Sequence, residues 1–111
     1  MSEEEKKFLN DILHRINLID LHLSHERNYF NFIKNPTVQS AIERELQVIG
    51  EAISRIIKLN PEVSISYVKI IISMRNRIVH AYDSVDKNII WKVINEDIPV
   101  LKTEVEKLLN E

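Results

Sequence analysis

Four polar side chains that could act on a phosphate lie close together in the second half of the chain: Arg75, Asn76, His80 and Tyr82. In a helix, which turns about 100° per residue, Asn76 and His80 share a face and Arg75 lies roughly a quarter turn from Asn76. A guanidinium is a permanent partner for phosphate, and a histidine can accept or donate a proton near neutral pH. These types are the minimum needed to cleave RNA without a metal ion, so Arg75 and His80 are the candidate catalytic pair.

The composition restricts the class of protein. The chain has 111 residues, one glycine, three prolines and no cysteine. This length suits one domain over residues 1–111, and the scarcity of turn residues argues against a sheet. The absence of cysteine excludes disulfides, thiolate catalysis and zinc sites built on sulfur. No apolar run approaches the ~20 residues that span a bilayer, and the acidic N-terminus lacks a signal-peptide core. We therefore expect a soluble, cytoplasmic protein with no membrane partner.

The charge distribution is more informative than the net charge of −2. Between Glu62 and Asp83 there is no acidic residue, whereas Lys69, Arg75 and Arg77 all fall there. This local excess predicts a small positive field around the motif, although three cations are also compatible with an ordinary solvated face. Outside the motif we expect neither a basic stripe nor an exposed aromatic ladder that would read bases.

The hydrophobic periodicity predicts an all-α fold. Helices are expected over residues 2–32, 36–59, from 64 or 66 to 82, and 86–109. Asn35-Pro36 is a strong start signal for the second helix. Gly50 indicates a helix crossing, and Pro99 should kink the last helix or start a new turn. Four helices with short connections form an up-down bundle.

The expected buried residues follow helical spacing. In the first helix they are Phe8, Ile12, Ile16, Ile19 and Leu23, widened by Leu9, Leu13 and Leu21, with Tyr29, Phe30 and Phe32 packing over the core. In the second they are Val38, Ile42, Leu46, Ile49, Ile53 and Ile56, and in the last Ile90, Ile94, Ile98, Leu101, Val105 and Leu108.

The third predicted helix has two apolar faces. One face carries Tyr67, Ile71, Met74, Ile78 and Tyr82, and the other carries Val68, Ile72 and Val79 with Arg75 among them. The second face is either a wide core stripe, with Arg75 extending to solvent at its edge, or a self-association surface. We favour a homodimer, in which twofold symmetry would bring two Arg75–His80 sets to one cleft.

These motifs resemble a known family. Arg75 to Tyr82 fits the R-x4-H-x-Y pattern of HepT-like toxins, which are HEPN-domain ribonucleases, and the resemblance covers nearly the whole chain. The run Leu46-Gln47-Val48-Ile49-Gly50-Glu51-Ala52 resembles the family's L-x-x-I-G-E-A segment. Val85-Asp86, Ile90-Trp91 and Asp97-Ile98-Pro99 resemble its V-D-x3-I/V-W and D-I/L-P segments. Tyr67 stands where the family often has Trp, and Ser73 where Gly is common.

The resemblance implies a HEPN-like four-helix bundle that forms a homodimer, with an active site built from both protomers. It implies a metal-independent endoribonuclease without a cofactor, acting on RNA and not on DNA, as the toxin of a type VII toxin–antitoxin system. It also implies a cognate partner, a minimal MNT-type nucleotidyltransferase antitoxin that transfers AMP from ATP to the motif tyrosine. That tyrosine would be Tyr82, although helical geometry places Tyr82 toward the core side unless the helix ends near Ala81.

In this ribonuclease mechanism, His80 would perform the proton transfers and Arg75 would hold the scissile phosphate. Asn76 would orient either the His80 imidazole or the phosphate. Two alternatives remain open. The chain could be a non-catalytic dimeric HEPN adaptor that binds nucleotide or serves as the substrate of a nucleotidyltransferase, or a plain helical interaction module. The pair His22 and His25, at i and i+3, offers only a weak metal site without a third ligand.

Overall fold

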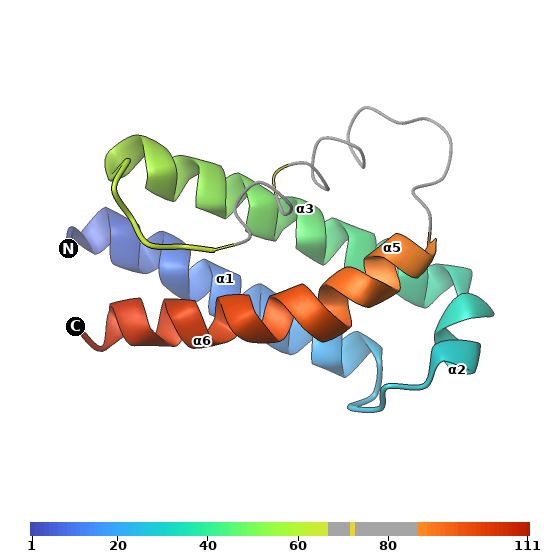
Figure 1. Ribbon diagram of the computed structural model, residues 1–111. Coiled ribbons are helices and arrows are strands. Elements are labelled where there is room, and N and C mark those ends of the chain that lie inside the picture. Colours follow the sequence, from blue (N-terminus) through green and yellow to red (C-terminus); the bar gives the residue numbers. More distant parts are fainter. Residues whose placement is uncertain (67–71, 73–86) are drawn as a thin grey trace.

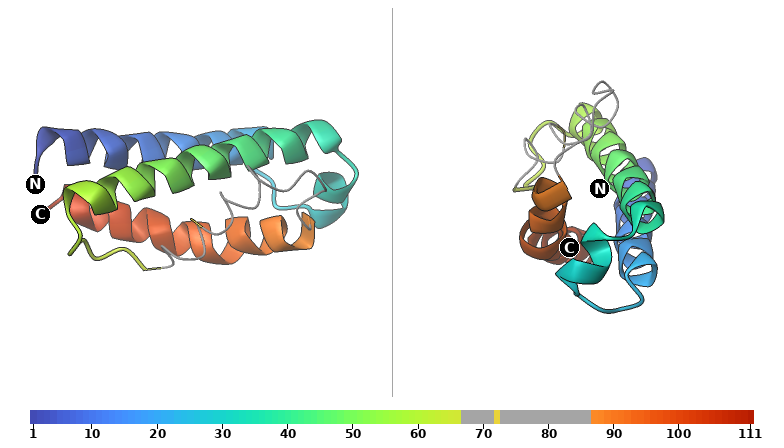
Figure 2. Two further views of the ribbon diagram at one scale, coloured as in Figure 1. Left: turned by 90° about the horizontal axis from the view of Figure 1, so that it is seen from above. Right: turned by 90° about the vertical axis from the view of Figure 1, so that its right-hand side faces the viewer.

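The computed structural model describes residues 1–66, 72 and 87–111 of this chain. Its elements are α1 (Glu3–His22), α2 (Tyr29–Ile33), α3 (Pro36–Leu59), α5 (Lys87–Lys92), the π-helix η1 (Val93–Asp97) and α6 (Ile98–Leu109). Three long units lie side by side: α1, α3 and the continuous C-terminal unit of α5, η1 and α6 (Figures 1 and 2). The fold is all-α, as predicted.

The long units are aligned along one direction. From the α2 end of the bundle, α3 and the C-terminal unit both run back toward the end where the two chain termini lie, antiparallel to α1 (Figure 2). This arrangement fits the predicted up-down bundle. The third predicted helix falls outside the described residues except at Ile72, which is helical.

The first helix is shorter than its periodicity predicts. Ser2 begins α1 with a capping box, in which the Glu5 amide donates to Ser2 Oγ at 3.1 Å and the Glu5 carboxylate accepts from the Ser2 amide at 3.4 Å. The helix ends at His22, and Ser24 and His25 adopt left-handed φ angles of 55° and 59°. These two residues turn the chain, so the prediction of one uninterrupted helix is wrong.

The aromatic residues belong to a separate short helix, α2. Asn28 caps it by accepting a hydrogen bond from the Asn31 amide at 3.0 Å, as asparagine commonly does at this position. At its other end, the buried side chain of Gln39 in α3 donates to the Phe32 carbonyl at 2.8 Å. The break between the two helices is marked in the sequence only by Ser24 and the cap residue Asn28, because residues 23–28 contain neither glycine nor proline.

The core lies where the three long units meet. Its fully buried side chains are Phe32, Leu9, Ile12, Ile19, Ile42, Leu46, Ile49, Ile53, Ile56, Ile90 and Ile94. The predicted inward faces of the second and last helices are therefore confirmed, with Val38 and Leu108 partly buried at their ends. Two expected core residues lie on the surface instead, since Leu21 is 56% exposed and Phe30 is 71% exposed. Leu21 lies about 200° around the helix from the buried Ile19, and in α2 only Phe32 is buried.

Helix α3 has the predicted bounds. Asn35 accepts a hydrogen bond from the Val38 amide at 3.1 Å, and Pro36 occupies the first turn, where its missing N–H leaves no bond unmade. Gly50 lies on the buried face, and its carbonyl accepts from Ser54 Oγ at 3.1 Å.

The C-terminal unit accommodates Pro99 by a change of helix type. Proline cannot donate to the carbonyl four residues earlier, that of Asn95. The chain widens into η1 over the turn before Pro99, with the Ile98 amide donating to the Val93 carbonyl, and α6 starts at Ile98. The helix therefore starts a new turn at the proline, which is one of the two predicted outcomes.

Candidate functional site

The predicted site residues Arg75, Asn76, His80 and Tyr82 lie outside the described residues. Their roles stay predictions, as does the two-protomer cleft. The structure does describe the chain on both sides of the motif, at Ile72 and from Lys87 onward, and the helices against which those flanking residues pack.

On the N-terminal side of the motif, Ile72 is half-buried and packs against the core. In the sequence it belongs to the second apolar face, whose other members Val68 and Val79 lie outside the described residues. The packing of this one member is compatible with both explanations of that face, the wide core stripe and the self-association surface. Arg75 follows Ile72 by three residues, which span at most about 11 Å when fully extended.

On the C-terminal side, the start of α5 faces α3 through an opposite charge. Burial raises the pKa of Glu43 in α3 above its ordinary value, and the nearby ammonium group of Lys87 partly opposes that rise. Lys87 is therefore near enough to Glu43 for the two charges to interact. The first buried residue of the chain that leaves the motif is Ile90 of α5.

Aromatic contacts also hold α5 in place. The Trp91 ring lies with its centroid 5.0 Å from that of the buried Phe32 and 5.7 Å from that of Tyr29. The Tyr29 hydroxyl donates to Asn88 Oδ1 at 2.6 Å, so a single side chain of α2 contacts α5 through both its ring and its hydroxyl. The family-like residue Trp91 therefore has a structural role, in which it joins α2 to the C-terminal unit.

The other family-like segments are also explained by packing. In the run from Leu46 to Ala52, Leu46, Ile49, Gly50 and Ala52 are buried, whereas Glu51 is exposed. In the last segment Ile98 is buried, and burial and the neighbouring Glu96 carboxylate raise the pKa of Asp97 against the opposing effect of Lys92.

A buried carboxylate that the sequence did not reveal connects α1 with α3. Glu45 is 5% exposed and accepts from Arg15 Nη1 at 3.0 Å and from His22 Nε2 at 2.8 Å. Because a carboxylate can only accept, the His22 proton at this contact lies on Nε2. The only advance signal was a glutamate placed within the apolar face of α3. Among residues 1–66, 72 and 87–111, no group of three or more His, Asp or Glu side chains is placed to hold a metal ion.

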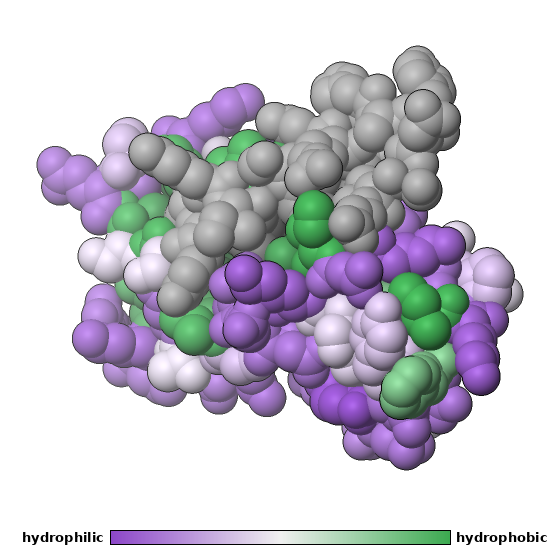
Figure 3. Space-filling view, turned by 45° about the vertical axis from the view of Figure 1, so that its right-hand side comes forward, coloured by the Kyte–Doolittle hydropathy of each residue, from purple (hydrophilic) through white to green (hydrophobic). Residues whose placement is uncertain are grey.

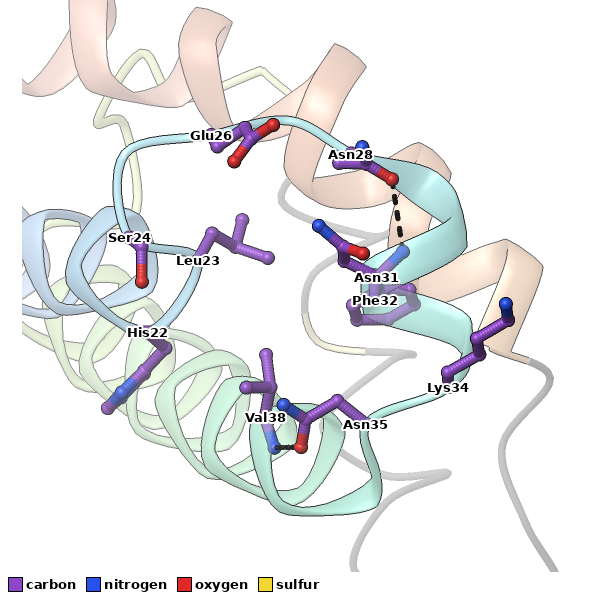
Figure 4. A pocket seen from close by; sticks show the side chains of 10 residues that line it. All are labelled: His22, Leu23, Ser24, Glu26, Asn28, Asn31, Phe32, Lys34, Asn35 and Val38. Carbon is purple, nitrogen blue, oxygen red and sulfur yellow. Dashed lines mark hydrogen bonds between the residues drawn. The ribbon is translucent and has the colours of Figure 1, made fainter.

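A cavity of about 410 Å³ opens beside this contact, between the α1–α2 turn, α2 and the start of α3 (Figure 4). Its floor is apolar, with Leu23, Phe32 and Val38, and its rim is polar, with His22, Ser24, Glu26, Asn28, Asn31, Lys34 and Asn35. Asn28 and Asn35 are already explained as helix caps, and His22 as a partner of Glu45. These structural roles account for much of the polar rim.

The described part of the chain is thus an all-α bundle, and the R-x4-H-x-Y sequence lies between two points anchored to its core. The ribonuclease HepT-like family model matches residues 12–108. This chain belongs to the HepT-like ribonuclease family, as the resemblance predicted, and the family supports a ribonuclease function.

Three relatives illustrate the similarity. A Thermococcus cleftensis protein named "Probable ribonuclease HepT" is 36% identical over 97% of this chain and 98% of its own length. A Methanocaldococcus jannaschii protein with a provisional RNase name is 36% identical over 91% of this chain and 93% of its own. A protein of Caldanaerobacter subterraneus, also provisionally named an RNase, is 34% identical over 74% of each chain. No solved structure matches this chain. Within the described residues, no helix has the length and hydropathy needed to cross a bilayer.

Proposed function

We propose that this chain is a metal-independent endoribonuclease and the toxin of a type VII toxin–antitoxin pair, active as a homodimer. One observation carries the proposal: a member of the HepT-like ribonuclease family has Arg75, Asn76, His80 and Tyr82 at the R-x4-H-x-Y spacing. A chain that served only as a helical interaction module would not need a forked cation and a titratable base together at this spacing.

In the proposed reaction, the ribose 2′-oxygen attacks the adjacent phosphorus while His80 removes its proton. The bond from phosphorus to the 5′-oxygen breaks, and that oxygen takes a proton from an acid, for which the partner copy of His80 is suited in a homodimer. The products are a 2′,3′-cyclic phosphate and a 5′-hydroxyl. Arg75 would neutralise the phosphorane with two parallel N–H bonds, a geometry that lysine cannot reproduce. Asn76, one helical turn before His80, would orient the imidazole or the phosphate.

Tyr82 has a separate, regulatory role in this proposal. A cognate MNT-type nucleotidyltransferase would transfer AMP from ATP to its phenol: the phenolic oxygen bonds to the α-phosphorus, and pyrophosphate leaves. The attached AMP would place bulk and negative charge where the RNA phosphates must lie, and would so inactivate the toxin.

The cleavage test compares the wild-type protein with His80→Ala and Arg75→Lys on total RNA, with the ends of the products mapped chemically. A matched control is His14→Ala, which removes an exposed histidine of α1. We expect wild type and the control to cleave and to leave cyclic phosphate ends, and His80→Ala to be inactive. Cleavage by His80→Ala at the wild-type rate would refute the assignment.

The modification test uses mass spectrometry after incubation with ATP and a nucleotidyltransferase encoded next to this chain. We expect wild type to gain one adenylyl group and lose activity, and Tyr82→Phe to gain none. Tyr29→Phe, whose phenol bonds to Asn88, is the control and should be modified like wild type. Equal modification of Tyr82→Phe would refute the tyrosine assignment. Modification of a wild-type protein that never cleaves RNA would favour the non-catalytic adaptor.

A further inference from the structure

Four aromatic rings form a continuous series from the core to the surface at the α2 end of the bundle. Phe32 is 1% exposed and contacts Trp91, Trp91 contacts Tyr29, and Tyr29 contacts Phe30 with 5.8 Å between ring centroids. Tyr29 and Trp91 are half-buried, whereas Phe30 is 71% exposed. The outermost ring therefore faces water while the rings behind it are fixed by the core.

The exposed ring contributes little to the stability of the fold. A phenylalanine that stays mostly in water contributes little of the stabilisation that a buried one provides. The two rings behind it are held by specific contacts. The Tyr29 hydroxyl donates a hydrogen bond to Asn88, and the Trp91 ring packs against the Phe32 ring. A rigid, partly exposed aromatic group of this kind is the usual construction of a surface on which nucleobases stack.

Cationic side chains lie one helical turn from the rings. Lys34 follows Phe30 by four residues at the end of α2, and it is exposed. Lys87 precedes Trp91 by four residues in α5, on the same side of that helix, although it also acts on Glu43. In single-stranded RNA, the flat faces of the bases can stack on aromatic rings, and the backbone phosphates can pair with lysines beside those rings.

The surface is also close to the motif along the chain. Tyr82 precedes Lys87 by five residues, which span at most about 18 Å when fully extended.

The size of the apolar area argues against a protein partner. Figure 3 shows only a small hydrophobic area at one end of the molecule, bordered by residues of intermediate and hydrophilic character. A stable protein interface needs a patch of about 800 Å² on each partner, far more than one exposed ring provides.

We infer that Phe30, supported by Tyr29 and Trp91, is a stacking surface for an unpaired base of the single-stranded RNA that the proposed ribonuclease cleaves. This inference rests on the proposed ribonuclease function and adds a binding site to it. Phe30 is a positioning residue here, and the chemistry stays with the motif.

The test measures binding of a fluorescently labelled 2′-O-methyl oligoadenylate, which lacks the attacking hydroxyl and so cannot be cleaved by the proposed reaction. Phe30→Leu keeps an apolar side chain but removes the ring, and it should weaken binding roughly five- to hundredfold. Phe30→Trp should bind at least as tightly as wild type. Leu21→Ala, which truncates an exposed apolar residue of α1, is the matched control and should bind like wild type.

A second readout is internal, because Trp91 is the only tryptophan of the chain. Its fluorescence should change when the probe binds wild type. Equal binding by Phe30→Leu and wild type, or no binding by wild type, would overturn the inference. An altered oligomeric state in Phe30→Leu at unchanged RNA affinity would also overturn it, and would assign the ring to a protein contact.

The two proposals fail in different ways. If wild type cleaves unmodified RNA while Phe30→Leu binds the probe normally, the stacking surface is wrong and the ribonuclease stands. If wild type binds the probe through Phe30 but cleaves no RNA, the binding surface stands and the catalytic proposal fails.

Discussion

The contact of Glu45 with Arg15 and His22 should make a measurable contribution to stability, because its carboxylate is withdrawn from water. The Glu45 side chain is 6% exposed, whereas Arg15 and His22 are 34% and 29% exposed. A hydrogen bond to a charged group contributes about 1.5–3 kcal/mol. Since Arg15 and His22 regain some water when Glu45 is replaced, we use the lower value for each bond. Glu45→Gln keeps the volume and one accepting oxygen but turns an NH₂ group toward the other donor, so one bond is lost and the free energy of unfolding should fall by about 1.5 kcal/mol.

Replacing the partner Arg15 is also informative, because it leaves the Glu45 carboxylate buried and charged. Arg15→Met should lower the free energy of unfolding by about 2–3 kcal/mol, since Glu45 would keep only His22 as a partner. Once Glu45→Gln has removed the charge, Arg15→Met should cost much less. The two substitutions should therefore be coupled by about 1–2 kcal/mol in a double-mutant cycle.

The assay is urea unfolding followed by far-ultraviolet circular dichroism, at a single protein concentration so that any self-association affects all variants alike. Asp20→Asn is the control, since it breaks the more exposed ion pair of Asp20 with Arg27 and should cost at most about 1 kcal/mol. The reasoning would be refuted if the losses of unfolding free energy caused by Glu45→Gln and Arg15→Met added within about 0.5 kcal/mol, because the stability of Glu45 would then not depend on Arg15.

Three further predictions follow from the described residues. Because the pKa of Glu43 is raised in the folded state, the folded protein binds more protons there, and stability is lost as pH rises from 4.5 through the raised value. Glu43→Gln should reduce this loss of stability. Lys87→Met should raise the pKa of Glu43 further, which carboxyl-carbon NMR titration would detect. An unchanged pKa of Glu43 in Lys87→Met would contradict the effect of the Lys87 charge on Glu43. Phe32→Ala should lower the free energy of unfolding by about 3–5 kcal/mol and alter Trp91 fluorescence; a loss below about 1 kcal/mol would contradict its burial. Ser2→Ala should cost about 1 kcal/mol by thermal or urea unfolding, and Ser2→Asp should retain the cap.

Several features of this protein could be predicted from the sequence by local rules. The bounds of α3 followed from Asn35-Pro36 at one end and Asn60-Pro61 at the other, because caps and prolines act within a single turn. The inward faces of α3 and of the C-terminal unit followed from helical periodicity. The family followed from residue types at fixed spacings.

Other features depended on contacts between distant segments, which periodicity does not encode. The chain leaves α1 through Ser24 and His25 without a glycine, and beyond the local signal of the cap residue Asn28 the place of α2 depends on its docking on α3 and α5. The same docking exposes Phe30, which apolar spacing had placed in the core. Glu45 looked like any glutamate until α1 supplied its partners.

The sequence by itself determined the bounds of α3, the buried faces of α3 and of the C-terminal unit, the family and the R-x4-H-x-Y motif, because each depends on residues within a few turns of one another. Only the tertiary structure decided that Ile72 packs on the core, that Glu45 is buried with Arg15 and His22, and that an aromatic ring remains in water beside the helix that follows the motif. The physical reason is that burial and pairing are set by which surfaces meet, and those surfaces come from segments far apart in the sequence, such as α1 and α6 or Tyr29 and Asn88.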